Sequence, residues 1–435
     1  MFNSRIYASQ LTAHIGERVT LSGWMHRLRN LSSISFLILR DRTGLAQIVI
    51  EDSALIETLT SVNSESILTV TGIVTAVEQA PNGVEIHNPT VEIVTHANVP
   101  PVFDLFRPTI KAQLPTILDN AALALRHPRQ RSLIQIASAT MTGFRQSLSA
   151  MDFTEIQTPK IVSTATESGA NVFEIDYFGK QAYLAQSPQF YKQMMVGVFE
   201  RVFEVGPVFR AEPHNTTRHL SQYTSLDAEM GFIEDHRTVM TTLTEVIRGM
   251  IESVWTNAES AVCELNLALP IVPTVIPEIH FSEVHQLYYQ ATGEDLRGEP
   301  DVSPAEERWL GEWAQREYNS DFLFVVGYPM RKRPFYTHPN RERPEYSNSF
   351  DLLFRGLELV TGGQRLHRYE DYLQAVEEWN IDPQSIEGYL TAFKHGMPPH
   401  GGWAIGLERF VARLAELQNI REATLFPRDM QRLTP

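Results

Sequence analysis

Five short segments rich in Val, Ile, Thr and Phe follow one another within about 80 residues near the N-terminal end of the chain. Turn-forming residues separate them at Asp41–Gly44 and at Pro81–Gly83, which is typical of short strands joined by tight turns. The five predicted strands are residues 19–25, 34–41, 46–50, 66–77 and 90–96. So many short strands in so few residues indicate a small closed β domain.

A five-stranded oligonucleotide-binding barrel (an OB-fold) is one of the few folds that satisfy this pattern. A Src-homology-like barrel would produce similar spacing, so the pattern by itself leaves both architectures open. We expect the barrel domain to span residues 1–100.

The hydrophobic period changes after a proline-rich stretch, residues 101–128, which we interpret as a linker or hinge. From Arg129 onward, apolar residues recur every three to four positions, which predicts an amphipathic helix that ends before residues 153–159. Strands and helices then alternate irregularly, which indicates an α+β domain on an antiparallel sheet over residues 129–435. Residues 231–320 are interpreted as a helical insertion, with helices over 237–254 and 304–318.

Composition limits the classes of function. The 435 residues include 37 Lys plus Arg against 52 Asp plus Glu, a formal net charge of −15, so a nucleic acid could bind only at a local basic patch. The single cysteine, Cys263, excludes an intrachain disulfide and a multi-cysteine zinc site. We find no signal peptide and no stretch near 18 apolar residues, and therefore expect a cytoplasmic protein without a membrane partner.

The chain has no P-loop, no GxGxxG fingerprint and no GxSxG elbow, so a nucleotide enzyme of this sequence would need side chains to hold phosphates. The segment FRAEPHNTTRHL (209–220) offers Arg210, His214, Arg218 and His219 around a turn-forming centre, which predicts a strand, a loop and a strand. Each arginine could grip a phosphate through two parallel hydrogen bonds. A solvated basic loop is the alternative.

The segment 347–367 contains a predicted hairpin with Arg355-Gly356 as its loop. This loop would pair Leu353 with Glu358 and Asp351 with Val360, which puts the two carboxylates on one face. Together with Thr361 they form a set of hard oxygen donors that suits Mg²⁺. An exposed face with two unrelated acids is the alternative.

Two further segments carry candidate chemistry. In GGWAIGLERFVARLAEL (401–417), glycines precede a helix that begins near Glu408 and Arg409, and an arginine against the helix dipole suggests an anionic or aromatic ligand, although a surface arginine would look the same. In QSPQFYKQMM (186–195), a helix capped by Ser187 with Pro188 in its first position would align Gln189 with Lys192. Glu167 lies in a loop of small residues, where it could meet a substrate ammonium or be an ordinary loop acid.

These segments, in this order, resemble the three motifs of the class II aminoacyl-tRNA synthetases, and most of all the aspartyl enzymes of the archaeal type. The similarity extends over essentially the whole chain, barrel included. The most specific strings are FRAEPHNTTRHL, YSNSFDLLFRGLEL, QSPQFYKQ and NIREATLFPRDMQRLTP. Asparaginyl enzymes look similar, but their arginine loop usually reads more like RAENSNTSRHL, so PHNTTRHL favours aspartate.

The resemblance implies a reaction: aspartate and ATP give aspartyl-adenylate and pyrophosphate, and a tRNA hydroxyl then takes the aspartyl group. It implies Arg210 and Glu358 as catalytic residues and Mg²⁺ at Asp351, Glu358 and Thr361. The implied ATP-binding residues are Arg210, Ala211, Glu212, Arg218, His219, Leu220, Tyr223, Glu358, Gly406, Leu407, Glu408 and Arg409, with Tyr223 and Arg409 on either side of adenine. The implied aspartate-binding residues are Glu167, Gln189, Phe190, Tyr191, Lys192, Arg210, Thr361 and Arg365.

In the barrel, the resemblance implies an anticodon surface made of His26, Arg29, Phe36, Gln47 and Pro89. Without it, Phe36 would be interpreted as a residue of the barrel core. His26 and Pro89 resemble the non-discriminating form, which charges both tRNA(Asp) and tRNA(Asn), and this form would pass its product to an amidotransferase. The resemblance also implies a homodimer, with Pro159 at the end of the interface motif.

Other interpretations stay open at this point. The chain could be a discriminating enzyme specific for tRNA(Asp), or an asparaginyl enzyme. It could also be an inactive paralogue that binds RNA, although such a protein would be expected to lack Arg210, Glu358 or Arg409, and all three are present. An asparagine-forming ligase on the same fold would typically lack the N-terminal barrel.

Overall fold

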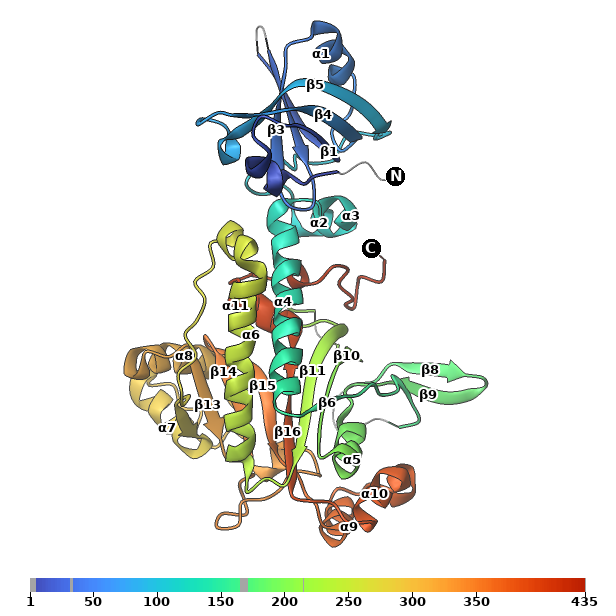
Figure 1. Ribbon diagram of the computed structural model, residues 1–435. Helices are drawn as coiled ribbons and strands as arrows, with labels where there is room; N and C mark the ends of the chain where they lie inside the picture. The colour runs from blue at the N-terminus through green and yellow to red at the C-terminus, as the bar shows by residue number, and fades with distance from the viewer. Residues whose placement is uncertain (1–4, 32–33, 165–170, 214, 435) are drawn as a thin grey trace. The chain divides into compact units, whose positions relative to one another are not determined.

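A computed structural model describes residues 5–31, 34–164, 171–213 and 215–434 of the chain (Figure 1). Two compact units divide the chain between His127 and Pro128. Within the described residues, we find no helix with the length and apolar character needed to cross a bilayer.

The first unit contains a closed barrel whose strands follow the order β1-β2-β3-β5-β4. The strands are β1 (Arg18–Asn30), β2 (Ser35–Arg40), β3 (Leu45–Ile50), β4 (Ile67–Ala76) and β5 (Val84–Thr95). All five predicted strands are confirmed, and Leu37, Ile48 and Val70 fill the interior. Strand β5 begins at Val84 rather than near Thr90, because a register shift in its pairing with β4 accommodates Pro89, which has no N–H to donate.

The rest of this unit is short. Helix α1 (Ser53–Thr60) joins β3 to β4, with the Asp52 carboxylate accepting the Ala54 N–H at 2.9 Å as its cap. Helices α2 (Leu114–Asp119) and α3 (Ala121–Ala124) follow the barrel, and a small apolar cluster forms around Phe103, Leu105 and Ala124. The predicted domain boundaries at residues 100 and 128 remain a prediction.

A β-bulge between Met25 and Arg27 turns His26 into the barrel wall, where the ring is 6% exposed. Its Nδ1 lies 3.4 Å from an Arg40 guanidinium nitrogen, and Arg40 is itself paired with the buried Glu65 at 2.7 Å. Burial, with the positive charge of Arg40 second, lowers the pKa of His26 to about 4 from its ordinary value of 6.5. The imidazole is therefore neutral at physiological pH.

This neutral histidine predicts that acid destabilises the barrel. Between pH 6.5 and pH 4 the unfolded chain binds a proton that the folded barrel does not, so its unfolding free energy should fall by roughly 3 kcal/mol. Urea titrations read by ¹⁹F NMR of 5-fluorotryptophan at Trp24, the one tryptophan in residues 1–127, would measure this loss. His26→Gln should flatten the dependence and His87→Gln should not; an equally steep dependence in His26→Gln would contradict the assignment.

The second unit is built on an eight-stranded sheet of order β12-β13-β14-β15-β16-β11-β10-β6, in which only the β12–β13 and β10–β6 pairs are parallel. Its strands are β6 (Thr154–Glu155), β10 (Arg201–Phe209), β11 (Gln222–Gly231), β12 (Glu278–His280), β13 (Phe322–Val326), β14 (Ser349–Phe354), β15 (Leu357–Gln364) and β16 (His400–Gly406). The predicted antiparallel α+β class is confirmed.

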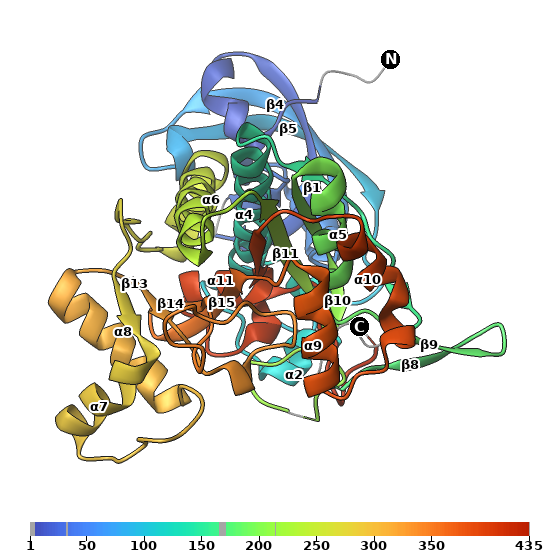
Figure 2. The same cartoon turned by 90° about the horizontal axis from the view of Figure 1, so that it is seen from below.

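Helices α4 (Pro128–Ala150) and α6 (His236–Leu265) lie side by side across one face of this sheet (Figures 1 and 2). Ile136, Phe144 and Leu148 of α4 pack against strand residues in one apolar core, which confirms the helix predicted from the three-to-four-residue period. The opposite face of the sheet is left to carry polar side chains.

Smaller elements surround the sheet. They are the three-stranded sheet of β7 (Ile161–Val162), β8 (Glu174–Tyr177) and β9 (Lys180–Leu184), and helices α5 (Gln189–Phe199), α7 (Phe281–Thr292), α8 (Pro304–Tyr318), α9 (Tyr369–Glu378), α10 (Glu387–Lys394) and α11 (Leu407–Leu414). The helix predicted over 304–318 is confirmed. Helix α5 begins at Gln189 rather than at Pro188, which is its cap residue, and the Ser187 hydroxyl accepts the Gln189 N–H at 3.1 Å.

The predicted β14–β15 hairpin forms, but half of its predicted register is wrong. Arg355 and Gly356 have φ values of 47° and 72°, as a two-residue turn of the mirror-image type requires. Leu353 pairs with Glu358 as expected, whereas Asp351 pairs with Thr361 and not with Val360. A bulge opposite Leu352–Leu353 inserts one extra residue, and it keeps Glu358 and Thr361 on the same face although they are three residues apart.

Candidate active site

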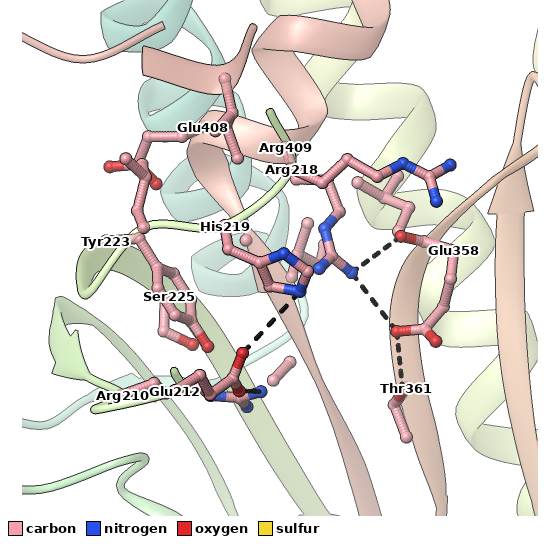
Figure 3. Close-up of a pocket in the computed structure, with 16 residues that line it drawn as sticks. Arg210, Glu212, Arg218, His219, Tyr223, Ser225, Glu358, Thr361, Glu408 and Arg409 are labelled. Atoms are coloured by element: carbon pink, nitrogen blue, oxygen red, sulfur yellow. Dashed lines mark hydrogen bonds and ion pairs between the residues drawn. The ribbon is translucent and has the colours of Figure 1, made fainter. Parts of the chain in front are cut away.

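A cavity opens on the polar face of the sheet and gathers residues from three of the predicted segments (Figure 3). The predicted ATP and metal residues that line it are Arg210, Glu212, Arg218, His219, Leu220, Tyr223, Glu358, Thr361, Gly406, Glu408 and Arg409. Segments separated by up to 200 residues in the sequence therefore line one site. From the sequence alone, some of these segments could also have been solvated loops.

The arginine loop forms one wall. Strands β10 and β11 are antiparallel neighbours, and residues 210–221 connect them, as the predicted strand, loop and strand require. Arg210 lies 3.6 Å from a Glu212 carboxylate oxygen, and the other oxygen of Glu212 lies 3.8 Å from His219 Nε2. The Arg210 guanidinium also stands over the Tyr223 ring, 5.7 Å from its centre. His214 falls outside the described residues.

Strand β15 and helix α11 form the facing wall. Arg409 donates to the Glu358 backbone carbonyl at 3.0 Å and lies 3.4 Å from the Glu358 carboxylate, which lies 3.5 Å from the Thr361 hydroxyl (Figure 3). The Arg409 side chain remains one-third exposed toward the cavity. Its position at the start of α11 is therefore explained by these partners on β15 rather than by the helix.

Glu408 has a structural role. Its two carboxylate oxygens each accept the Thr224 backbone N–H at 3.0 Å, so the carboxylate ties the start of α11 to strand β11. Burial raises the pKa of Glu408 to about 7, against the hydrogen bonds that lower it.

The donors at Asp351, Glu358 and Thr361 fit a divalent cation. Burial, with the negative charge of Glu358 adding to it and Arg333 opposing, raises the pKa of Asp351 to about 6. Glu307 of helix α8 accepts the Glu358 N–H at 3.3 Å, and burial together with Glu358 raises the pKa of Glu307 to about 7. A cation would relieve this repulsion, and hard oxygens are what Mg²⁺ prefers.

The fit depends on a shift of Asp351. Arg333 donates to the Asp351 carboxylate at 2.9 Å. In the described part of the chain, groups of three or more His, Cys, Asp or Glu side chains arranged as a ready metal cage are absent. The three side chains therefore offer the oxygen donors that Mg²⁺ prefers, but Arg333 holds one of them, the Asp351 carboxylate. Glu307 was not predicted from the sequence because it lies in the insertion, where the sequence shows little recognisable chemistry.

Two acids on strand β11 were also missed. Tyr223, Ser225, Asp227 and Glu229 alternate with Leu226, Ala228 and Met230, which lie in the apolar core. The first four therefore share the polar face, and Ser225 in the cavity donates from its hydroxyl to the buried Asp227 carboxylate. The signal was available in the sequence as a strict two-residue alternation directly after the arginine loop.

Below the cavity, these acids hold two buried cations. Lys192 of α5 is 1% exposed, lies 3.0 Å from Asp227 and 3.4 Å from Glu229, and donates to the Trp403 carbonyl at 2.9 Å. Arg365 donates to Glu229 at 2.9 Å and to the Gly402 carbonyl at 3.1 Å. Although burial would raise it, Arg365 and Lys192 hold the pKa of Glu229 below its ordinary value.

Close packing at Gly402 makes room for this cluster. A Cβ at that position would lie 2.1 Å from the Ala228 carbonyl and 2.3 Å from a Glu229 carboxylate oxygen. Glycine therefore allows the Glu229 carboxylate to reach both cations.

The other residues predicted to bind the substrate aspartate have different surroundings. Gln189 is buried and donates to Gln193 at 2.9 Å, Phe190 packs in an apolar cluster with its ring stacked 4.2 Å from Tyr389, and Tyr191 is half-buried. Glu167 falls outside the described residues. Of the predicted ATP residues, Leu407 lies in the apolar core, and Ala211 donates its backbone N–H to the Asn171 carbonyl at 2.9 Å.

In the barrel, four of the five predicted anticodon residues are at the surface. Leu37 and Leu39 point inward, so Phe36 lies on the outer face, with Arg29 and Val49 directly opposite on the neighbouring strands. Gln47 shares that face through its pairing with Ile38 and donates to Glu85 at 2.6 Å. Pro89 lines a groove beside Val49, whereas His26 is buried in the barrel wall.

Comparison with known proteins agrees with this arrangement. Residues 113–430 match the family model described as tRNA synthetases class II (D, K and N), and residues 19–94 match that of the OB-fold nucleic acid binding domain. The Src-homology-like alternative is thereby excluded.

Similar proteins extend over the full length of the chain. One from Thermus thermophilus, named aspartate–tRNA(Asp/Asn) ligase, is 44% identical over 99% of this chain and 100% of its own. One from Pyrococcus abyssi, named aspartate–tRNA(Asp) ligase, is 38% identical over 99% of each. The crystal structure of asparaginyl-tRNA synthetase from Pyrococcus horikoshii with asparaginyl-adenylate superimposes with a TM-score of 0.93 at 29% identity, covering 100% of both chains.

An arginine-lined cavity on an antiparallel sheet, an OB-fold barrel earlier in the chain and full-length similarity to named ligases all lead to one assignment. The chain belongs to the class II tRNA synthetases of the D, K and N group.

Proposed function

We propose that this protein attaches L-aspartate to tRNA(Asp) and to tRNA(Asn), using ATP and passing through aspartyl-adenylate. The observation that carries the proposal is a continuous line of contacts. Ser225 lines the arginine-rich cavity and donates to Asp227, and Asp227 pairs with Lys192 at 3.0 Å. A triphosphate site thus adjoins a buried pair of cations suited to a substrate carboxylate.

The residue types suit adenylate formation. Attack of the aspartate carboxylate on the α-phosphorus forms a mixed anhydride and releases pyrophosphate, and negative charge spreads over phosphate oxygens in between. Arg210, Arg218 and His219 supply positive charge and hydrogen bonds to those oxygens, with Arg210 at the reacting phosphate. Tyr223 and Arg409 bind the adenine ring. No side-chain nucleophile is needed, so positioning and electrostatics account for the chemistry.

Mg²⁺ belongs to the same proposal. Asp351, Glu358 and Thr361 would hold it, with Asp351 released from Arg333. When bound, the ion would neutralise negative charge on the phosphates. The raised pKa values of Asp351 and Glu307, each caused in part by Glu358, support a cation at this position.

Selection of aspartate over asparagine is electrostatic in this proposal. Lys192 and Arg365 would bind the substrate side-chain carboxylate in addition to Asp227 and Glu229, whereas an amide would bring no negative charge to them. Hydrogen bonds to a charged group contribute about 1.5–3 kcal/mol, or about 10- to 150-fold in selectivity. The same argument disfavours an asparaginyl enzyme, despite the structural similarity to one.

The proposed tRNA scope rests on the name of the Thermus thermophilus relative and on the resemblance of His26 and Pro89 to the non-discriminating form. Aspartyl-tRNA(Asn) requires amidation before use, so we expect hand-off to an amidotransferase. We also propose a cytoplasmic homodimer with Pro159 at the end of its interface segment.

Two assays test the proposal. Aspartate-dependent exchange between ATP and pyrophosphate, at millimolar Mg²⁺, reports adenylate formation; no exchange with aspartate would overturn it. Aspartylation of separate tRNA(Asp) and tRNA(Asn) transcripts reports scope. If only the tRNA(Asp) transcript is charged, the enzyme is discriminating; exchange with asparagine in place of aspartate would make it an asparaginyl enzyme.

Phe36 provides a prediction for the barrel. Stacking of a base on one aromatic ring contributes roughly 1–3 kcal/mol, so Phe36→Ala should raise the KM for tRNA by about 5- to 150-fold. ATP–pyrophosphate exchange without tRNA should be unchanged. Val94→Ala, at an exposed aliphatic residue on β5 that is 54% exposed, is the matched control. An unchanged KM for tRNA in Phe36→Ala would exclude Phe36 from the anticodon surface.

A further inference from the structure

Four polar side chains lie behind the Lys192–Arg365 cluster, each of them 3% exposed or less. They are Gln193 on α5, Tyr372 on α9, Tyr389 on α10 and His400 on β16. An apolar cluster that includes Phe190 and Phe393 surrounds them. Buried polar groups are costly unless every donor and acceptor is satisfied, so such a group calls for a specific explanation.

Here the hydrogen bonds form a connected network. Gln193 Nε2 donates to the Tyr372 hydroxyl at 3.2 Å and to His400 Nε2 at 3.0 Å. The Tyr389 hydroxyl donates to Gln193 Oε1 at 3.1 Å and lies 2.9 Å from the Tyr372 oxygen. The Tyr372 hydroxyl donates to the Leu366 carbonyl at 3.0 Å.

His400 fixes the direction of these bonds. With its Nδ1–H donated to the Pro398 carbonyl at 3.0 Å, its Nε2 is an acceptor for Gln193. This arrangement requires a neutral imidazole, and burial lowers the pKa of His400 to about 4. The network therefore adds no charge of its own beside Lys192, Arg365 and their two acids.

Each end of the network joins a segment that carries the charged cluster. Gln193 follows Lys192 on α5, and the Tyr372 bond ends at Leu366, the residue after Arg365. The Arg365 backbone N–H donates to the His400 carbonyl at 2.9 Å. The carbonyls of Trp403 and Gly402, which receive the two cations, follow on the same strand.

We infer that Gln193, Tyr372, Tyr389 and His400 are positioning residues that set the spacing of Lys192 and Arg365 for recognition of the amino-acid side chain. The inference rests on the proposed function and extends it: helices α9 and α10 contribute to amino-acid specificity although neither lines the cavity. A fork of two cations discriminates a carboxylate from an amide only while both point at it, and shifts below 1 Å weaken such recognition.

Tyr372→Phe tests this with minimal change in packing, because it removes one hydroxyl from the centre of the network. We expect the KM for aspartate in ATP–pyrophosphate exchange to rise about 10-fold while the KM for ATP stays within about two-fold. The preference for aspartate over asparagine, measured as the ratio of kcat/KM values, should fall by a similar factor. Tyr389→Phe is a second variant, should Tyr372→Phe not fold.

Tyr369→Phe is the matched control, since Tyr369 lies on the same helix but packs on Lys394 at 5.4 Å, outside the network. A purely structural role would lower thermal stability or change both KM values together, and either result without a change in selectivity would overturn the inference. Failure of the proposed function would give a different result, because the wild-type enzyme would then activate asparagine instead of aspartate. The same variants would in that case be compared by their KM for asparagine.

Discussion

Arg210→Lys is expected to lower aspartate-dependent ATP–pyrophosphate exchange by about 10²–10³-fold, the typical loss when one preorganised donor to a developing negative charge is removed. Lysine keeps the positive charge but not the planar fork that binds two oxygens at once. Arg210 stands at the cavity wall with a side chain that is 36% exposed, so the substitution should leave thermal unfolding unchanged. The loss should appear mainly in kcat.

The same measurement on Arg201→Lys provides the control. Arg201 begins the same strand, β10, and donates to the Met151 carbonyl at 3.1 Å, away from the cavity-lining residues. It should exchange at the wild-type rate. If Arg210→Lys retained wild-type kcat with aspartate, Arg210 could not be the residue at the reacting phosphate, and the assignment of the whole arginine loop would need revision.

Local patterns predicted the elements of this fold well. The barrel strands were predicted from their residue types and the turn residues between them, and helix α4 from its three-to-four-residue period. The Arg355-Gly356 turn was predicted from its sequence. The register of β14 against β15 was not predicted, because a β-bulge depends on tertiary packing and no local residue type indicates it. The sequence contained Thr361 as a metal candidate, but only the bulge explains why it shares a face with Glu358.

Prediction of the site was uneven for a physical reason. Residues that stand out by type, such as Arg210 and Arg409, are identifiable from the amino-acid sequence alone. The alternation on β11 puts Asp227 and Glu229 on one face, but acids on a strand look like surface residues until the cations that pair with them are known. Lys192 and Arg365 come from elements far apart in the chain, so their convergence on Glu229 is a property of the tertiary fold.

Lys192→Met should strongly weaken aspartate binding and also destabilise the second unit. Methionine fills nearly the same volume but leaves Asp227, which is 1% exposed, without its cation, and Glu229 with one fewer. Removing one partner of a buried ion pair costs about 3–5 kcal/mol, which urea titration of the full chain should detect. The KM for aspartate should rise at least about 10²-fold, because half of the proposed carboxylate fork is gone.

Lys160→Met separates recognition from stability. Lys160 pairs with the buried Glu204 at 2.7 Å, but Glu204 also accepts hydrogen bonds from the Thr158 hydroxyl at 2.7 Å and the Thr158 N–H at 3.2 Å. Because those bonds still satisfy its carboxylate, the loss should be about 1–2 kcal/mol, with the KM for aspartate unchanged. If Lys192→Met lost stability yet bound aspartate as tightly as the wild-type enzyme, Lys192 would be a structural cation. Recognition of the substrate carboxylate would then belong to Arg365.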